Sequence, residues 1–216
     1  MVEKTIQNIL ELGIIVEYGK ELGKHIQLED LETQYDAVFL AFGANMASKM
    51  HIPGEHLQGV YGGNQLLESG EHPNYTGKKV AIIGGGNVAM DTARTIQRKG
   101  AAEVTVIYRR AEEQMPAEKK EIADAKQEGI QFLFQTNVKA IQGIQAVEKI
   151  ECVQTELLPK GGESRLSPVD IEGSNFFLPM EYVVMAVGSQ TEEFVTQTLG
   201  VTLDTSGKVK IDEKKE

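Results

Sequence analysis

A glycine-rich turn between a strand pattern and a helix pattern is the part of this sequence best suited to chemistry. The run "KKVAIIGGGNVAMDTARTIQRKG" holds G-x-G-x-x-A at Gly84, Gly86 and Ala89. The first glycine permits a tight bend, and the second lets a pyrophosphate approach the backbone. Free N–H groups and the positive end of the helix dipole would hold the phosphates. We therefore expect a dinucleotide-binding turn made of Gly84, Gly85, Gly86, Asn87 and Val88.

The next strand pattern, "EVTVIYRR", indicates which dinucleotide would bind. An NAD-binding unit usually ends this strand with an acid, roughly 20 residues beyond the turn. Here it ends in Arg109 and Arg110, and no acid follows until Glu112. Paired guanidinium groups are charge-assisted, fork-shaped donors that match a 2′-phosphate. They favour NADPH over NADH, and the alternative is a solvated pair against Glu112 and Glu113.

The elements that would position these residues alternate between strand and helix. A β-α-β-α-β pattern runs from Lys79 to Phe134, with Pro116 suited to the first turn of the second helix and Gly129 to its end. Such alternation is typical of a parallel sheet with right-handed crossovers. Three later strand patterns, "VKAIQG", "VEKIECVQTEL" and "NFFLPM", have no helix between them. The sequence predicts an α/β, Rossmann-like domain with a small antiparallel meander.

One phrase is written twice in the chain. "YDAVFLAFGA" spans residues 35–44 and "EYVVMAVGS" spans residues 181–189. Each is an apolar run closed by Ala-x-Gly, which predicts a strand covered on both faces with a small-residue exit. Small residues there would let the backbone pass close to a cofactor at the carboxyl ends of the strands. The second exit adds Ala186, Val187 and Gly188 to the candidate cofactor site, unless the two runs are unrelated buried strands.

The remaining segments carry weaker signals. Helical spacing predicts a helix at the start of the chain, ended by Gly13, and "IIVEY" at residues 14–18 predicts a short strand. Glycine and proline punctuate residues 45–77, where only "NQLLES" is helical, so this stretch is interpreted as a linker. Near the end, "TEEFVTQTLG" predicts a short helix and "KVKID" a last strand.

Composition excludes several classes of function. A net charge of −10 repels nucleic acid and anionic lipid, so neither is expected as a partner. The single cysteine, Cys152, excludes an internal disulfide and a cysteine-ligated iron–sulfur cluster, and the four histidines lack metal-ligand spacing. No apolar run approaches the roughly 20 residues that span a membrane. The first residues do not match a signal peptide, so we expect a cytoplasmic protein.

Taken in order, "GGGNVAMD", "YRR" and "MPA" resemble the small (beta) subunit family of bacterial glutamate synthase. The chain is also similar to the electron-input part of dihydropyrimidine dehydrogenase and, more distantly, to thioredoxin reductase. In that family an NADPH domain is inserted into a FAD domain, and the chain crosses between the two twice. The resemblance implies an NADPH-dependent oxidoreductase that passes hydride to FAD, with electrons going on to a large (alpha) glutamate synthase-type or other electron-accepting subunit.

The resemblance also implies a division of the chain. Residues 1–77 would be a partial FAD-type domain and linker, 78–190 the NADPH domain, and 191–216 a return segment toward the FAD-type domain. The second G-x-G-x-x-G and the Gly-Asp element with which the family binds FAD are missing. We therefore expect a fragment that neither retains FAD nor is active alone, and we assign no catalytic residue.

Two other functions remain open at this point. The chain could be a stand-alone NADP-dependent dehydrogenase, because Tyr75 and Lys79 match the Tyr-x-x-x-Lys spacing of short-chain enzymes. Gly77 between them and the strand that follows count against a catalytic helix there. A dinucleotide-sensing module without enzyme activity is the other alternative. Bound flavin in a longer form of the protein would favour the flavin-dependent reductase over both.

Overall fold

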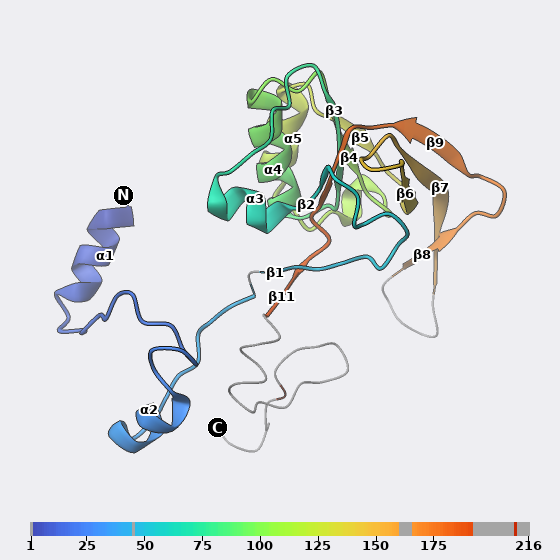
Figure 1. Ribbon diagram of the computed structural model, residues 1–216. Coiled ribbons are helices and arrows are strands. Elements are labelled where there is room, and N and C mark those ends of the chain that lie inside the picture. The colour runs from blue at the N-terminus through green and yellow to red at the C-terminus, as the bar shows by residue number, and fades with distance from the viewer. Residues whose placement is uncertain (1, 45, 160–165, 192–209, 211–216) are drawn as a thin grey trace. The chain divides into compact units, whose positions relative to one another are not determined.

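A computed structural model describes residues 2–44, 46–159, 166–191 and 210 (Figure 1). The chain divides into two compact units. One comprises residues 44–190, and the other comprises residues 1–43 and 191–216. The larger unit is built around a five-stranded sheet, and it holds every residue expected in the cofactor site.

The five-stranded sheet is parallel throughout, with strand order β2-β10-β3-β4-β5. Its strands are β2 (Val60–Gly62), β10 (Tyr182–Met185), β3 (Lys79–Ile83), β4 (Glu103–Ile107) and β5 (Gln131–Leu133). The α/β class and the parallel sheet are confirmed. The chain runs outward from β3 in one direction through β4 and β5, while β10 and β2 lie on its other side. The carboxyl ends of β3 and β10 therefore flank the point where the strand order reverses, which is where α/β sheets bind ligands.

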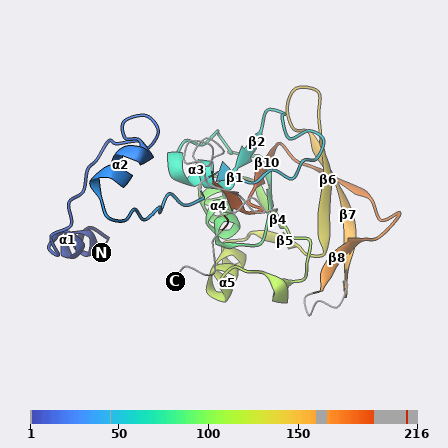
Figure 2. The same cartoon turned by 90° about the horizontal axis from the view of Figure 1, so that it is seen from below.

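Helices cover one face of this sheet: α3 (Gly63–Ser69), α4 (Asn87–Arg98) and α5 (Lys119–Gln127) (Figures 1 and 2). The alternation of side chains along β3 assigns Val80 and Ile82 to this layer, where they pack with Ala89, Met90 and Ile96 of α4. Helices α4 and α5 end close to the expected glycines. Gly100 follows α4 and Gly129 follows α5, both in the left-handed region, at φ +91° and +86°.

An antiparallel meander covers the other face, as the figures show for β6 to β9. Its strands are β6 (Thr136–Gln142), β7 (Lys149–Leu158), β8 (Ser167–Asp170) and β9 (Phe176–Pro179). Ala81 and Ile83 of β3 pack here against Val138, Ile150 and Cys152. The meander predicted from the sequence is confirmed, and it turns the sheet into the central layer of three.

Residues 45–77 are more than the linker that the sequence suggested. Residues 60–62 form the edge strand β2, which pairs in parallel with β10, and α3 follows at once. The strand escaped prediction because three residues ending in Gly62 show no period of two. It forms because β10, more than 120 residues later in the chain, offers an open edge.

The smaller unit departs further from expectation. Its described residues form α1 (Val2–Leu10), as expected, and α2 (Leu28–Gln34). The strands expected at residues 14–18 and 35–42 are not formed, so these two predictions are wrong for the structure. Most side chains in both segments are exposed, with Ile15 89% and Phe39 92% exposed, whereas Val38 and Phe42 are half-buried. An apolar run predicts burial on two faces, but no described strand pairs with either segment. The expected helix and strand after residue 191 lie outside the described residues, apart from Lys210.

The two Ala-x-Gly exits lead into one small ladder. β1 (Met46–Ala47) follows the first exit, β11 (Ser189–Gln190) follows the second, and the two strands pair antiparallel. Ser48 extends the ladder by donating its N–H to the Gly188 carbonyl at 3.0 Å. The chain thus passes between its two units at residues 43–44 and 190–191, beside this ladder. A short 3₁₀ turn, η1 (Glu112–Gln114), completes the elements of the larger unit.

Candidate functional site

A cleft of about 750 Å³ opens at the carboxyl ends of β3, β4 and β10. All ten residues that the sequence singled out line it: Gly84, Gly85, Gly86, Asn87, Val88, Arg109, Arg110, Ala186, Val187 and Gly188. These residues come from three separate segments of the chain. The parallel register of the sheet brings them together because it sets the ends of β3, β4 and β10 side by side.

The three glycines of the turn have different surroundings. Gly84 has φ +143°, and a β-carbon there would lie 2.2 Å from the Ala186 carbonyl oxygen. A β-carbon on Gly85 would lie 2.6 Å from the Tyr108 ring. Gly86 has an ordinary φ of −93°, and its β-carbon would meet only Pro116, at 4.0 Å. Nothing within the described chain requires a glycine at residue 86, so the space beside it is available to a ligand.

Helix α4 begins directly on this turn without a cap. Gly86 is the N-cap residue, and it has no side chain that could cap the helix. Ala89 donates its N–H to the Gly86 carbonyl at 3.0 Å, which leaves the N–H groups of Asn87 and Val88 without a partner within the helix. The helix dipole is positive at this end. Ala89 is fully buried, which keeps α4 close to β3. The turn offers N–H donors and partial positive charge to an anion such as a pyrophosphate.

A strap formed by residues 111–118 lies against the turn. Tyr108, just before the strap, packs its ring on Gly85 and donates its hydroxyl to the Gln114 carbonyl at 2.8 Å. Ala117 donates its N–H to the Gly85 carbonyl at 3.1 Å. These contacts give Tyr108 a packing role at the end of β4. Pro116, expected in the first turn of α5, lies in the strap instead, because α5 begins at Lys119.

The two arginines occupy different environments. Arg109 is exposed, whereas Arg110 is 8% exposed and donates from Nη2 to the Leu166 carbonyl at 3.0 Å. The buried Nε of Arg110 has no hydrogen-bond partner, and neither arginine forms an ion pair within the described residues. Glu112, the carboxylate that could have paired with them, instead bonds Lys126 at 2.6 Å. A buried guanidinium that lacks a carboxylate partner and has a donor without an acceptor is suited to bind an anionic ligand.

Residues in and next to the meander hold the backbone of this pair in place. Gln135, in the left-handed region at φ +48°, donates its N–H to the Arg110 carbonyl at 3.0 Å. Thr155 donates its hydroxyl to the Arg109 carbonyl at 2.8 Å. The backbone of both arginines is therefore anchored to β6 and β7, while their side chains line the cleft.

A bulge in β6 places a third cation on the cleft wall. The register between β6 and β7 shifts between Val138 and Ala140, which makes Lys139 the extra residue. Lys139 lines the cleft and pairs with Asp170 at 2.8 Å, and Asn137 bonds the same carboxylate at 3.0 Å. Burial acts to raise the pKa of Asp170, but the hydrogen bonds from Lys139 and Asn137 lower it below its ordinary value.

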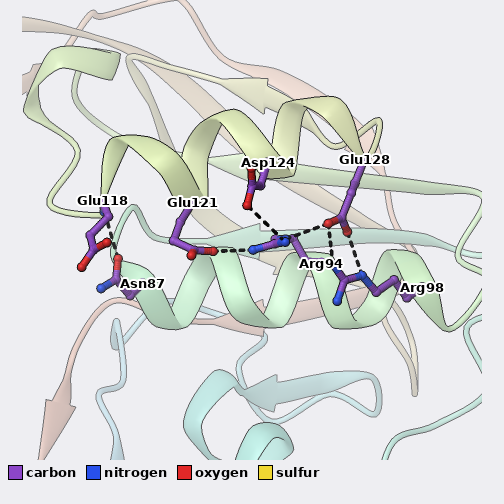
Figure 3. A network of polar contacts seen from close by, with 7 residues as sticks. All are labelled: Asn87, Arg94, Arg98, Glu118, Glu121, Asp124 and Glu128. Carbon is purple, nitrogen blue, oxygen red and sulfur yellow. Dashed lines mark hydrogen bonds and ion pairs between the residues drawn. The ribbon is translucent and has the colours of Figure 1, made fainter.

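An ionic network joins the two helices behind the turn (Figure 3). Arg94 of α4 contacts Glu121, Asp124 at 3.5 Å and Glu128 at 2.9 Å, and Arg98 bonds Glu128 at 2.5 and 3.0 Å. The hydrogen bond from Arg98, followed by that from Arg94, holds the pKa of Glu128 below its ordinary value. The network fixes α4 against α5, and hence the turn against the strap.

Sequence reasoning did not find several residues of the cleft wall: Ser48, Lys49, Asn64, Pro116, Asn137 and Lys139. They come from the segment taken as a linker, from the strap and from the bulged strand. The short strand β2 and the bulge depend on pairing with distant strands, so the local sequence pattern did not predict that these residues line the cleft.

Comparison with known proteins gives a consistent family. The family model described as pyridine nucleotide-disulphide oxidoreductase matches residues 2–216. The glutamate synthase (NADPH) small chain of Halomonas elongata is 36% identical in an alignment of 217 positions that covers 94% of this chain and 46% of that protein. The NADP(+)-dependent formate dehydrogenase subunit beta of Moorella thermoacetica is 37% identical over 87% of this chain and 27% of its own. The chain thus spans less than half the length of these relatives.

Solved structures with a similar fold are also named as oxidoreductases. FprA of Mycobacterium tuberculosis in complex with NADPH superposes with a TM-score of 0.76 at 25% identity, over 89% of this chain and 58% of that one. Thioredoxin reductase of T. acidophilum shares the fold, with a TM-score of 0.58 at 20% identity. Among the described residues, no helix combines the length and apolarity needed to cross a membrane. With a match over nearly its whole length and relatives above 30% identity, the chain belongs to the pyridine nucleotide-disulphide oxidoreductase family.

Proposed function

We propose that the cleft binds NADPH and that the protein is the NADPH-binding portion of a flavin-dependent oxidoreductase. One observation carries this proposal. An uncapped helix N-terminus beside the unobstructed Gly86 and a buried, carboxylate-free Arg110 line the same cleft. The turn would hold the pyrophosphate, and Arg109 and Arg110 would hold the 2′-phosphate. Ala186, Val187 and Gly188 would let the nicotinamide half pass close to the backbone.

The chemistry would belong to the cofactors. NADPH supplies a hydride, and FAD would accept it, which leaves NADP⁺ and reduced flavin. The chain's own residues bind and orient the nucleotide, and no side chain of the cleft is assigned a role in bond making or breaking. This division of labour suits a cleft whose donors are backbone N–H groups, arginines and lysines.

We further propose the domain division suggested by the sequence, with its first boundary moved to the crossing at residues 43–44. Residues 44–190 would be the NADPH domain, and the flanking segments would belong to a FAD-type domain. The exposed apolar side chains of residues 14–18 and 35–42 support this proposal, because they are suited to burial against further strands. Flavin would then be bound by a longer form of the protein.

A partner subunit is part of the proposal. The relatives named above are a small chain and a beta subunit of larger enzymes. We propose that electrons pass from flavin to an accepting subunit, of which a large glutamate synthase-type chain is the first candidate. The cleft offers no feature that chooses among such acceptors.

The structure does not support a catalytic role for the Tyr75-x-x-x-Lys79 motif, on which the dehydrogenase alternative rested. Tyr75 is 1% exposed, its hydroxyl lies 3.2 Å from Nδ1 of His72, and its ring packs edge-on against Tyr182. It does not line the cleft, so it cannot serve as an acid for a substrate bound there.

Titration of the chain with NADPH and NADH tests the proposal. We expect NADPH to bind at least tenfold more tightly, because the 2′-phosphate adds charge-assisted hydrogen bonds. The variant with Arg109→Ala and Arg110→Ala should lose this preference and keep its weak binding of NADH. Equal wild-type affinities for the two nucleotides would contradict the proposed specificity.

A further inference from the structure

Asn87, the first residue of α4, uses its side chain within the protein. Its Oδ1 accepts the backbone N–H of Glu118 at 3.0 Å (Figure 3). Glu118 is the N-cap residue of α5, and its N–H has no partner within that helix. A residue expected to touch the cofactor therefore contributes its backbone N–H to the cleft, while its side chain ties the start of one helix to the start of the next.

A second bond repeats the connection one residue earlier. Ala117 donates its N–H to the Gly85 carbonyl at 3.1 Å. Two consecutive N–H groups of the strap, from Ala117 and Glu118, thus hold two residues of the turn, Gly85 and Asn87. Between them lies Gly86, whose open side faces Pro116 at 4.0 Å.

The geometry assigns a specific task to this pair of bonds. Three consecutive glycines are flexible, and ordering them around a ligand costs conformational free energy at the moment of binding. A turn that is already held in its binding shape avoids that cost. We propose that Asn87 is a positioning residue, which presets the turn for a pyrophosphate by accepting the Glu118 N–H. This inference rests on the proposed function of the cleft.

The chemistry of the amide suits the task. An aspartate at residue 87 could accept the same hydrogen bond, but it would place a negative charge beside the bound phosphates. A neutral amide oxygen accepts the hydrogen bond without that repulsion. We call this bond, from the Glu118 N–H to Oδ1 of Asn87, the brace. The arginines are anchored separately, through Gln135, Thr155 and Leu166, so loosening the brace should leave the 2′-phosphate site intact.

A comparison of two ligands distinguishes loss of this one hydrogen bond from a general loss of structure. NADP⁺ carries both the pyrophosphate and the 2′-phosphate, whereas 2′-AMP carries the 2′-phosphate alone. In Asn87→Ala we expect affinity for NADP⁺ to fall about 3- to 10-fold, the range of one hydrogen bond, while affinity for 2′-AMP stays within twofold. A general loss of structure would lower both affinities, and thermal unfolding of each variant checks that the fold is retained.

A change at the donor tests the same bond from its other end. Glu118 has φ −62°, which proline adopts, so Glu118→Pro removes the N–H with little demand on its own backbone angle. Glu118→Ala keeps the N–H, and comparison of the two variants isolates the donor from the side chain. Asn87→Ala combined with Glu118→Pro should bind NADP⁺ no more weakly than the weaker single variant, because both remove one bond.

The outcomes are distinct. Selective loss of NADP⁺ affinity with non-additive variants supports the brace. Wild-type affinity of Asn87→Ala for NADP⁺, equal losses for both ligands, or additive losses in the double variant would overturn it. If the wild-type chain bound neither ligand, the proposed function would fail, and the inference with it. If the wild type binds both and Asn87→Ala does the same, the inference alone fails.

Discussion

The carbonyl oxygen of Ala186 occupies the place that a side chain on Gly84 would need. A β-carbon on Gly84 would lie 2.2 Å from this oxygen, and Ala186 in turn donates its N–H to the Ile83 carbonyl at 2.8 Å. The end of β3 and the exit of β10 are thus in direct backbone contact. Gly84, the first glycine of the turn, and Ala186, the small residue that follows β10, therefore contact each other directly.

This contact separates two glycines that look equivalent in the sequence. We expect Gly84→Ala to lower the free energy of unfolding by about 2–5 kcal/mol, because it combines a strained φ with a steric overlap. Gly86→Ala should change it by less than about 1 kcal/mol, since its backbone and surroundings accept a methyl group. Denaturant unfolding of the two variants measures the difference. Equal losses would show that the turn differs from the one described.

Replacement of Arg110 should separate stability from binding. Its guanidinium is buried without a carboxylate partner and leaves Nε without a hydrogen bond. Arg110→Met keeps much of the side-chain volume and removes an uncompensated charge. We expect the free energy of unfolding to change by less than about 1 kcal/mol, while NADPH affinity falls about tenfold or more. A large loss of stability with unchanged NADPH affinity would mean that Arg110 serves the fold.

The ionic network between α4 and α5 predicts a pH dependence. The pKa of Glu128 is lowered in the folded protein from its ordinary value of 4.5, through Arg98 first and Arg94 second. A group with a depressed folded pKa stabilises the fold above its unfolded pKa, and this contribution disappears as pH falls through the folded value. Wild type should therefore be more stable than Glu128→Gln at pH 6–7, and the difference between their thermal midpoints should shrink as the pH falls below 4.5. A constant difference down to pH 3 would contradict the assignment.

The single thiol reports on opening of the meander. Burial, with a smaller contribution from Glu151, raises the pKa of Cys152 to about 12, and its side chain is fully buried. The thiolate is the reactive form, so the native protein should not react with a thiol reagent at pH 8 within the time of an ordinary assay. One equivalent should react after addition of denaturant. Rapid labelling of the native chain would show that β7 opens readily.

The order of the central elements could be predicted because each one carries its own local signal. Val80 to Ile83, the glycine turn and the apolar face of α4 follow directly from the spacing of residues, and the structure has them where they were expected. The ten candidate residues lie along one cleft for the same reason. Parallel strands with regular crossovers bring their carboxyl ends to one edge, whatever the loops between them.

The parts that could not be predicted depend on partners far away in the chain. The three residues of β2 form a strand only because β10 pairs with them, and Lys139 reaches the cleft wall through a bulge set by β7. The apolar run around Phe39 shows the opposite error. Its composition favours a buried strand, but burial requires neighbours, and none of the described strands pairs with it.

Binding of NADPH to Gly86→Val tests the central claim most directly. A β-carbon on Gly86 would meet only Pro116, at 4.0 Å, so valine should be accommodated by the fold and should occupy the space of the pyrophosphate. Isothermal titration with NADPH, together with denaturant unfolding of the same sample, gives both quantities. We expect one equivalent of NADPH to bind the wild type and none to bind the variant, with cooperative unfolding in both. A variant that unfolds cooperatively and binds NADPH with wild-type affinity would contradict the assignment of this turn as the phosphate site.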